Sequence, residues 1–199
     1  MNAPVPQRPP KQKNPPVYEA FDWVETFLAA FITVILVFTF LFRIVVVNGT
    51  SMTNTLQEND YLILSKLSEE PKRGEIVVLQ VNTYEDGKKP LIKRVIATGG
   101  QWVDIDFDTW SVYVGDTRET MEKIEEDYVL FRPDVRMHYA YTAEEYPKQV
   151  PEGKLFVMGD NRNGSMDSRD PIIGFVPADH VLGRAVFRLF PLSSIGALG

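Results

Sequence analysis

The chain contains no cysteine and only two histidines, His138 and His180, among its 199 residues. The absence of cysteine excludes disulfides, thiolate nucleophiles and cysteine-based zinc sites, and it suits a domain outside the cytoplasm without proving that location. Two histidines argue against a multi-histidine metal site, so we expect no metal and no other cofactor. A basic excess is missing as well. The net charge of −6 therefore argues against nucleic acid as a partner.

The N-terminal segment is rich in proline and has no acidic residue. Residues 1–16 contain six prolines together with Arg8, Lys11 and Lys13. This composition is typical of an extended, disordered basic leader, which we place at residues 1–20.

An uncharged apolar run of seventeen residues follows, at 26–42. As a helix it measures about 26 Å, slightly less than the ~30 Å hydrocarbon core of a bilayer. Trp23 and Val24 can lengthen it at one end and residues 44–47 at the other. We therefore predict a single transmembrane helix over residues 21–44.

Two other interpretations of this run are a cleavable signal peptide and a buried core helix. The run is longer than the apolar part of a signal peptide, and Arg43 follows it in place of a small-x-small cleavage site. Helices that are apolar all round are rare in small soluble domains. Basic residues precede the span, so the positive-inside rule puts the N-terminus in the cytoplasm and residues 45–199 outside it. The lipid bilayer is then an expected partner.

Beyond the span the pattern changes to short runs of β-type residues separated by turns. Strands are predicted at 61–64, 75–79, 91–96, 154–158 and 181–189, and the alternation through 102–114 predicts a strand or hairpin. The domain is therefore expected to be mainly β and antiparallel. Residues 115–150 lack a core pattern and carry many charges, as an insertion would.

Ser51 lies in the turn at residues 48–52, a few residues beyond the predicted span. A hydroxyl placed there can act on another chain that emerges from the same bilayer. A serine in such a turn commonly bonds only to nearby backbone, whereas a nucleophile also needs a base within hydrogen-bond reach. His138 lies in the charged insertion and His180 follows Asp179. Neither has a catalytic motif around it, although a Ser-His-Asp arrangement stays open.

Lys93 is a second candidate base. On the predicted strand it shares one face with Leu91, Val95 and Ala97. An ammonium group on an apolar face is costly, and burial favours the neutral amine, which can take a proton from a serine hydroxyl. The alternative is a lysine that extends into solvent at the edge of the sheet.

The loop at residues 159–169 is dense in turn formers and charges and directly follows a predicted strand. A loop closed by its own hydrogen bonds would explain the Asp and Asn residues but not the whole string. Ser165 can hold a lysine amine in place. Asp167 and Arg169 can brace the loop through a charge-assisted pair.

These three segments resemble the motifs of type I bacterial signal peptidases, the membrane-bound Ser/Lys proteases that remove signal peptides from exported proteins. The serine box of the family matches residues 51–56, its lysine box matches 93–96, and its Gly-Asp-Asn-Arg…Ser…Asp-Ser-Arg loop matches 159–169. The resemblance extends from Phe21 to Ile195.

The resemblance implies that Ser51 is the nucleophile, that Lys93 is the general base and that Ser165 orients Lys93. It implies supporting roles for four charged loop residues: Asp160, Arg162, Asp167 and Arg169. The implied fold is an antiparallel β catalytic domain with a smaller inserted β region at about residues 101–157. The implied partners are preprotein signal peptides, cut after a small-x-small site, and the protein-export machinery.

The chain departs from the family pattern at Asn54, where proline usually precedes the Thr-Leu pair. Because proline fixes the backbone φ angle, we expect asparagine to leave the serine loop looser. Gly49 has no side-chain donor, so an oxyanion hole would depend chiefly on backbone N–H groups, that of Ser51 first.

Two other functions fit part of the pattern. A self-cleaving Ser/Lys peptidase shares the dyad, but it would be expected to carry a DNA-binding domain and its own scissile loop. A non-catalytic, membrane-tethered β binding module would have the strands but no reason to keep Ser51, Lys93 and Ser165 together.

Overall fold

The computed structural model describes residues 16–66, 70–82, 88–137 and 146–198. Most of the predicted leader, at 1–15, and the candidate base His138 lie outside the described residues. The chain separates into a helical unit that ends at Phe40 and a β domain that begins at Leu41.

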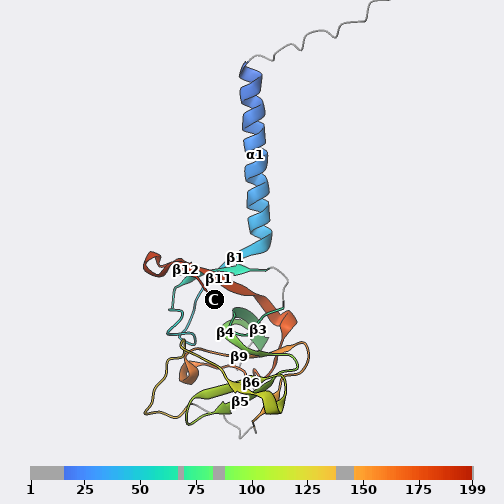
Figure 1. The fold of residues 1–199 in the computed structure, drawn as a ribbon. Helices are drawn as coiled ribbons and strands as arrows, with labels where there is room; N and C mark the ends of the chain where they lie inside the picture. Colours follow the sequence, from blue (N-terminus) through green and yellow to red (C-terminus); the bar gives the residue numbers. More distant parts are fainter. Residues whose placement is uncertain (1–15, 67–69, 83–87, 138–145, 199) are drawn as a thin grey trace, which may run out of the picture. The chain divides into compact units, whose positions relative to one another are not determined.

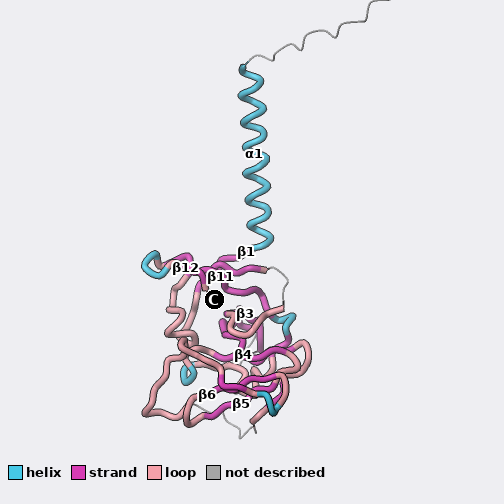
Figure 2. The backbone as a smooth tube through the Cα atoms, viewed as in Figure 1, coloured by secondary structure: helices cyan, strands magenta, loops and turns pink. Residues whose placement is uncertain are grey.

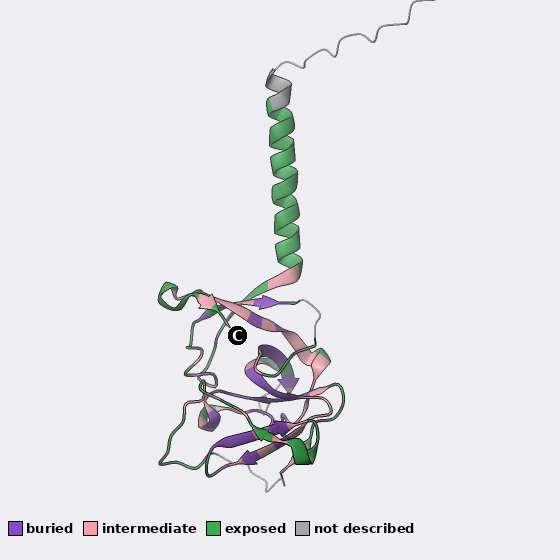
Figure 3. Ribbon diagram, viewed as in Figure 1, coloured by how far each residue is buried: buried purple, intermediate pink, exposed green. Residues whose placement is uncertain are grey.

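Helix α1 spans Pro16–Leu41. Its part Ala20–Leu41 is, within the described segments, the one helix long and apolar enough to cross a membrane. From Ala20 to Leu41, almost all apolar side chains are exposed, around the whole circumference of the helix (Figure 3). The hydroxyls of Thr26, Thr33 and Thr39 each donate to the carbonyl four residues earlier, so these polar groups are satisfied within the helix. Such a surface is suited to apolar surroundings.

The helix ends at Leu41 and not at the expected residue 44. Phe42–Val46 instead forms strand β1, because it pairs along its whole length with β2 (Tyr61–Ser65). The 22 residues of Ala20–Leu41 already measure about 33 Å, enough for a ~30 Å hydrocarbon core. The additional length therefore comes from the N-terminal side of the apolar run.

The domain is built from antiparallel strands, which confirms the predicted mainly β fold (Figures 1 and 2). The larger sheet contains eight of the described strands, in the order β1-β2-β11-β3-β4-β9-β10, with β12 beside β11. Its remaining strands are β3 (Ile76–Asn82), β4 (Lys88–Thr98), β9 (Lys154–Met158), β10 (Val176–Pro177), β11 (Val181–Phe190) and β12 (Gly196–Ala197). The helical segments described within the domain are single 3-10 turns: η1 (Arg118–Thr120), η2 (Arg162–Gly164), η3 (Ala178–His180) and η4 (Leu192–Ser194).

The second sheet has the order β7-β6-β5-β8 in the described part of the chain. Its strands are β5 (Trp102–Asp106), β6 (Ser111–Gly115), β7 (Glu122–Lys123) and β8 (Lys148–Gln149). The second sheet ends before the expected boundary at residue 157, because β9 belongs to the larger sheet, where it pairs with β4. We call residues 102–149 the inserted region.

The two sheets share one apolar core. Ile96 and Phe156 of the larger sheet pack in the same buried cluster as Val103 and Val112 of the inserted region. A separate buried cluster, formed by β2, β3 and β11, also contains residues of the turn after β1. The core therefore fixes both the inserted region and the serine turn to the same sheet.

Candidate active site

Ser51 lies on a turn that the core holds on both sides. The side chains of Met52 and Leu56 are buried, at 1% and 0% exposure, in the cluster formed with Leu64 and Val78. Within the turn, the N–H groups of residues 55 and 56 donate to the Met52 carbonyl. Ser51 itself is half-buried, so its hydroxyl stands on a rigid support and stays accessible.

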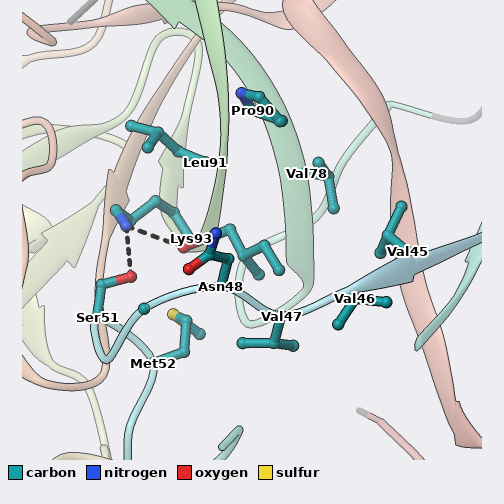
Figure 4. A pocket seen from close by; sticks show the side chains of 12 residues that line it. Val45, Val46, Val47, Asn48, Ser51, Met52, Val78, Pro90, Leu91 and Lys93 are labelled. Atoms are coloured by element: carbon teal, nitrogen blue, oxygen red, sulfur yellow. Dashed lines mark hydrogen bonds between the residues drawn. The ribbon is translucent and has the colours of Figure 1, made fainter. Parts of the chain in front are cut away.

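Lys93 is buried on β4, with 2% of its surface exposed, and does not extend into solvent. Its Nζ lies 2.8 Å from Ser51 Oγ and donates to the carbonyl of Ile92 at 3.0 Å. Figure 4 shows the two side chains meeting end to end. The fold thus joins two residues that are far apart in the sequence.

Burial lowers the pKa of Lys93 from 10.5 to about 8. The Asp167 and Asp160 carboxylates favour the charged amine and Arg169 opposes it, but removal of water is the largest cause. A large fraction of the amine is therefore neutral near pH 8. Its lone pair can then accept the Ser51 proton across the existing contact.

The loop after β9 closes on the backbone of the serine turn. The Asn161 N–H donates to the Ser51 carbonyl at 3.0 Å, and the Asn161 side-chain amide donates to the Thr50 carbonyl at 3.0 Å. A Cβ at Gly159 would lie 2.5 Å from the Ser51 carbonyl oxygen, so only glycine fits there. The sequence interpretation missed Asn161, because an asparagine in a turn-rich loop is explained by the turn itself.

Ser165 also reaches this site. A Cβ at Gly159 would lie 2.3 Å from Ser165 Oγ, so Ser165 and Ser51 pack against the same glycine. Ser165 Oγ is buried beside Asp167, whose carboxylate it helps to keep charged, and it makes no hydrogen bond to Lys93 in the described structure. Lys93 bonds instead to Ser51 and to the Ile92 carbonyl. The role of Ser165 in orienting Lys93 therefore stays a prediction.

Asp160 joins the loop to β4 and to the serine turn. Its carboxylate accepts two hydrogen bonds from the buried Arg94, at 3.0 Å from Nε and 2.8 Å from Nη2. Thr55 Oγ1 donates to the same carboxylate. A bidentate pair of this kind fixes orientation as well as distance.

Arg162 pairs with Glu126 of the inserted region in a buried ion pair. Its Nε also donates to the Gly159 carbonyl at 3.2 Å. The Tyr128 hydroxyl donates to Glu126 at 2.9 Å, and the Tyr128 ring lies 3.9 Å from the Arg94 guanidinium. Glu126 and Tyr128 were not identified from the sequence, where they lie in an acidic stretch without a motif.

The expected pair of Asp167 and Arg169 is present and buried. Arg169 donates to both carboxylate oxygens, from Nε at 2.8 Å and from Nη2 at 2.9 Å. Asp167 also accepts the Gly159 N–H at 2.9 Å. Burial alone would raise the pKa of Asp167, but the Arg169 guanidinium and these hydrogen bonds hold it below its ordinary value. The loop is therefore braced around a charged carboxylate.

A cavity of about 400 Å³ opens beside Ser51 and Lys93 (Figure 4). Apolar side chains provide much of its lining, among them Val45, Val47, Met52, Val78, Leu91 and Ile92. In the described structure, residues 90–93 of β4 pair with β3 on one side only, because β9 pairs with β4 from Arg94 onward. The site therefore combines a small apolar cavity with an open strand edge.

No described contact joins a histidine to Ser51, as a Ser-His-Asp arrangement would require. His180 ends η3, and its Nδ1 is buried without a hydrogen-bond partner in the described part of the chain. His138 lies outside the described residues. The base that the structure places against Ser51 is Lys93.

Comparison with known proteins points to one family. The family model described as signal peptidase, peptidase S26, matches residues 20–190. The chain is 37% identical over 158 residues to the probable signal peptidase I-1 of Synechocystis sp., which covers 75% of this chain and 71% of the relative. It is 33% identical over 178 residues to signal peptidase I of Bacillus licheniformis, covering 88% and 91%. A crystallised signal peptidase I from Enterococcus faecalis V583 is similar with a TM-score of 0.44 at 25% identity, covering 59% of this chain and 98% of that chain.

Acylation of Ser51 should follow the ionisation of Lys93. Because only the neutral amine can accept the serine proton, the rate at which a neutral electrophilic reagent acylates Ser51 should rise with pH and level off above an apparent pKa of about 8. Lys93→Met should lower this rate at least about 100-fold. Mass spectrometry of the labelled chain over roughly pH 6 to 10 measures the rate, with Ser51→Ala as the blank. A profile that does not change with pH, or a midpoint near 10.5, would contradict the assignment.

Proposed function

The chain belongs to the signal peptidase family, peptidase S26, and we propose that it cleaves signal peptides with Ser51 as the nucleophile and Lys93 as the general base. The single observation that carries this assignment is the 2.8 Å contact between Ser51 Oγ and the buried Lys93 Nζ. The enzyme is a serine endopeptidase, and its substrates are the signal peptides of preproteins.

The reaction proceeds through an acyl-enzyme. Neutral Lys93 takes the Ser51 proton as Oγ attacks the carbonyl carbon of the scissile peptide bond. The tetrahedral intermediate breaks its C–N bond, and the Lys93 proton passes to the departing amine. Neutral Lys93 then takes a proton from water as the water oxygen attacks the ester, and the product leaves as a carboxylic acid that ionises in water. The proton returns to Ser51 Oγ.

The negative oxygen of the intermediate needs hydrogen-bond donors. The Ser51 N–H donates to no acceptor among the described residues, so it is available for this role. Gly49 has a φ of 96° and no side chain to contribute. We assign the Ser51 N–H as the principal donor.

The substrate lies extended along the open edge of β4 at residues 90–93. In an extended chain, alternate side chains point to the same side. Two side chains two residues apart would then face the apolar cavity of about 400 Å³. This arrangement supports a site read at two alternate positions, as in small-x-small, because both side chains would face the cavity beside Ser51.

The supporting residues hold these groups in register. Asp160, Arg162, Asp167 and Arg169 fix the loop that bonds to the Ser51 backbone. Ser165 is proposed to orient the Lys93 amine, because its buried hydroxyl lies next to the glycine that Ser51 contacts.

Cleavage of a preprotein by the detergent-solubilised full chain tests this function. Ser51→Ala and Lys93→Met should abolish cleavage and leave the circular dichroism spectrum unchanged, and Ser165→Ala should lower kcat about tenfold or more. His180→Ala is the matched control and should cleave at the parental rate. Cleavage that persists in Lys93→Met, or is lost in His180→Ala, would exclude the Ser/Lys mechanism. Cleavage of the chain itself in place of the preprotein would favour the self-cleaving alternative, and no cleavage at all would favour a binding module.

We further propose that α1 crosses the cell membrane once, with the N-terminus in the cytoplasm and the domain outside. The basic residues before α1 support this orientation. The domain also exposes large apolar side chains, including Ile44 on β1, Phe190 on β11 and Leu192 on η4, and these support the bilayer as a partner of the domain. The export machinery is a proposed partner because it delivers the preproteins.

The lack of native cysteine allows a clean topology test. Single-cysteine variants Asn14→Cys, Glu119→Cys and Leu192→Cys are treated in intact cells with a membrane-impermeant maleimide. The cysteine at 119 should be labelled at once and that at 14 only after lysis. The cysteine at 192 should react more slowly than that at 119, because lipid covers it. Labelling at 14 in intact cells would refute the orientation, and equal rates at 119 and 192 would refute the bilayer contact.

A further inference from the structure

Asn54 has a backbone conformation that few residue types adopt. Its φ angle is 99°, a region that side chains generally avoid and that asparagine tolerates better than most. Proline fixes φ near −65° and cannot take this conformation. The serine turn of this chain is therefore built differently from one that carries proline at this position.

The Asn54 side chain links the serine turn to the inserted region. Its Nδ2 donates to the Tyr128 carbonyl at 2.9 Å, across 74 positions of sequence. The accepting segment is itself held, because the Tyr128 ring lies 3.9 Å from the Arg94 guanidinium and its hydroxyl donates to Glu126. The expectation that asparagine leaves this loop looser is thus wrong for the described structure: the residue is anchored.

Asn54 lies close enough to Ser51 along the chain for its bond to Tyr128 to affect the position of the nucleophile. Ser51 lies three residues before it, and the next residue, Thr55, donates to Asp160. The backbone of Asn54 therefore sets the direction of the chain between Ser51 and Thr55, the residue that bonds to Asp160. The contact of Ser51 Oγ with Lys93 Nζ spans only 2.8 Å, and misplacement of reacting atoms by about 1 Å costs about 100-fold in rate.

We propose that Asn54 is a positioning residue of the Ser51 nucleophile, acting through its left-handed backbone and its bond to the Tyr128 carbonyl. The proposal rests on the proposed function of Ser51. In this chain a cross-link to the inserted region provides the rigidity that proline would otherwise give.

A series of substitutions at Asn54 separates the two contributions. Asn54→Gly keeps the φ angle and removes the side-chain bond, so kcat for preprotein cleavage should fall about fivefold. Asn54→Ala also strains the backbone, and kcat should fall about 30-fold. Asn54→Pro cannot adopt the conformation and should lose about 100-fold or more. KM should stay unchanged, because Asn54 is not among the residues that line the cavity.

Asn59 provides the matched control. It too has a positive φ, of 70°, and it is exposed, but it makes no side-chain bond to the inserted region in the described structure. Asn59→Gly should therefore keep the parental kcat. All rates are measured well below each variant's own melting temperature, so a loss of stability alone does not lower them. The pH midpoint of kcat/KM should stay near 8 in Asn54→Gly, because Lys93 remains buried.

A double-mutant cycle tests the link itself. Tyr128→Ala removes the ring that holds the accepting carbonyl, so Asn54→Gly should add little further loss in that background. The proposal is overturned if Asn54→Pro cleaves at or above the parental rate, if Asn54→Gly equals the parent, or if Asn54→Gly and Asn59→Gly lose equal activity. Failure of the proposed function shows differently, as cleavage that persists in Ser51→Ala. If Ser51→Ala does not cleave but all the Asn54 variants keep the parental kcat, only the positioning role of Asn54 is refuted.

Discussion

Burial of the Lys93 amine against Ser51 is the constraint on which the rest of the structure depends. In water a lysine is protonated at neutral pH and has no lone pair to offer. Removal of water lowers the pKa of Lys93 to about 8, but it also costs free energy that the surrounding fold must offset. Lys93 lies on β4, within a sheet whose strands contribute to the buried apolar clusters, and this placement keeps the amine from turning out to solvent.

The charges around Lys93 are arranged in pairs. Arg94 pairs with Asp160 and Arg169 pairs with Asp167, and both pairs are buried. The carboxylates favour the charged form of Lys93 and Arg169 disfavours it. Because these opposing effects partly cancel, burial remains the largest influence on the pKa of Lys93. Buried ion pairs gain little net stability because their desolvation is costly. Their value here is geometric: they fix the loop whose Asn161 bonds to the Ser51 carbonyl.

The sequence was most informative where local pattern decides the structure. Apolar runs predicted the main strands, and the resemblance to the family's motifs selected Ser51 and Lys93, which the fold brings into contact. It was least informative where distant segments decide. The helix ends early because Phe42–Val46 pairs with a partner strand. Glu126 joins the site because Arg162, 36 positions away, pairs with it. Such contacts leave no signal in local composition. The side-chain bond of Asn54 likewise reaches a carbonyl 74 positions away.

The most direct test of the account is a titration of Lys93 itself. The Cε resonance of ¹³C-labelled lysine can be followed against pH in the full chain in detergent micelles, with Lys93→Met to assign the signal. The account predicts that one lysine titrates with a pKa of about 8 and that this signal is missing in Lys93→Met. A Lys93 signal that titrates near 10.5, as an exposed lysine does, would contradict it.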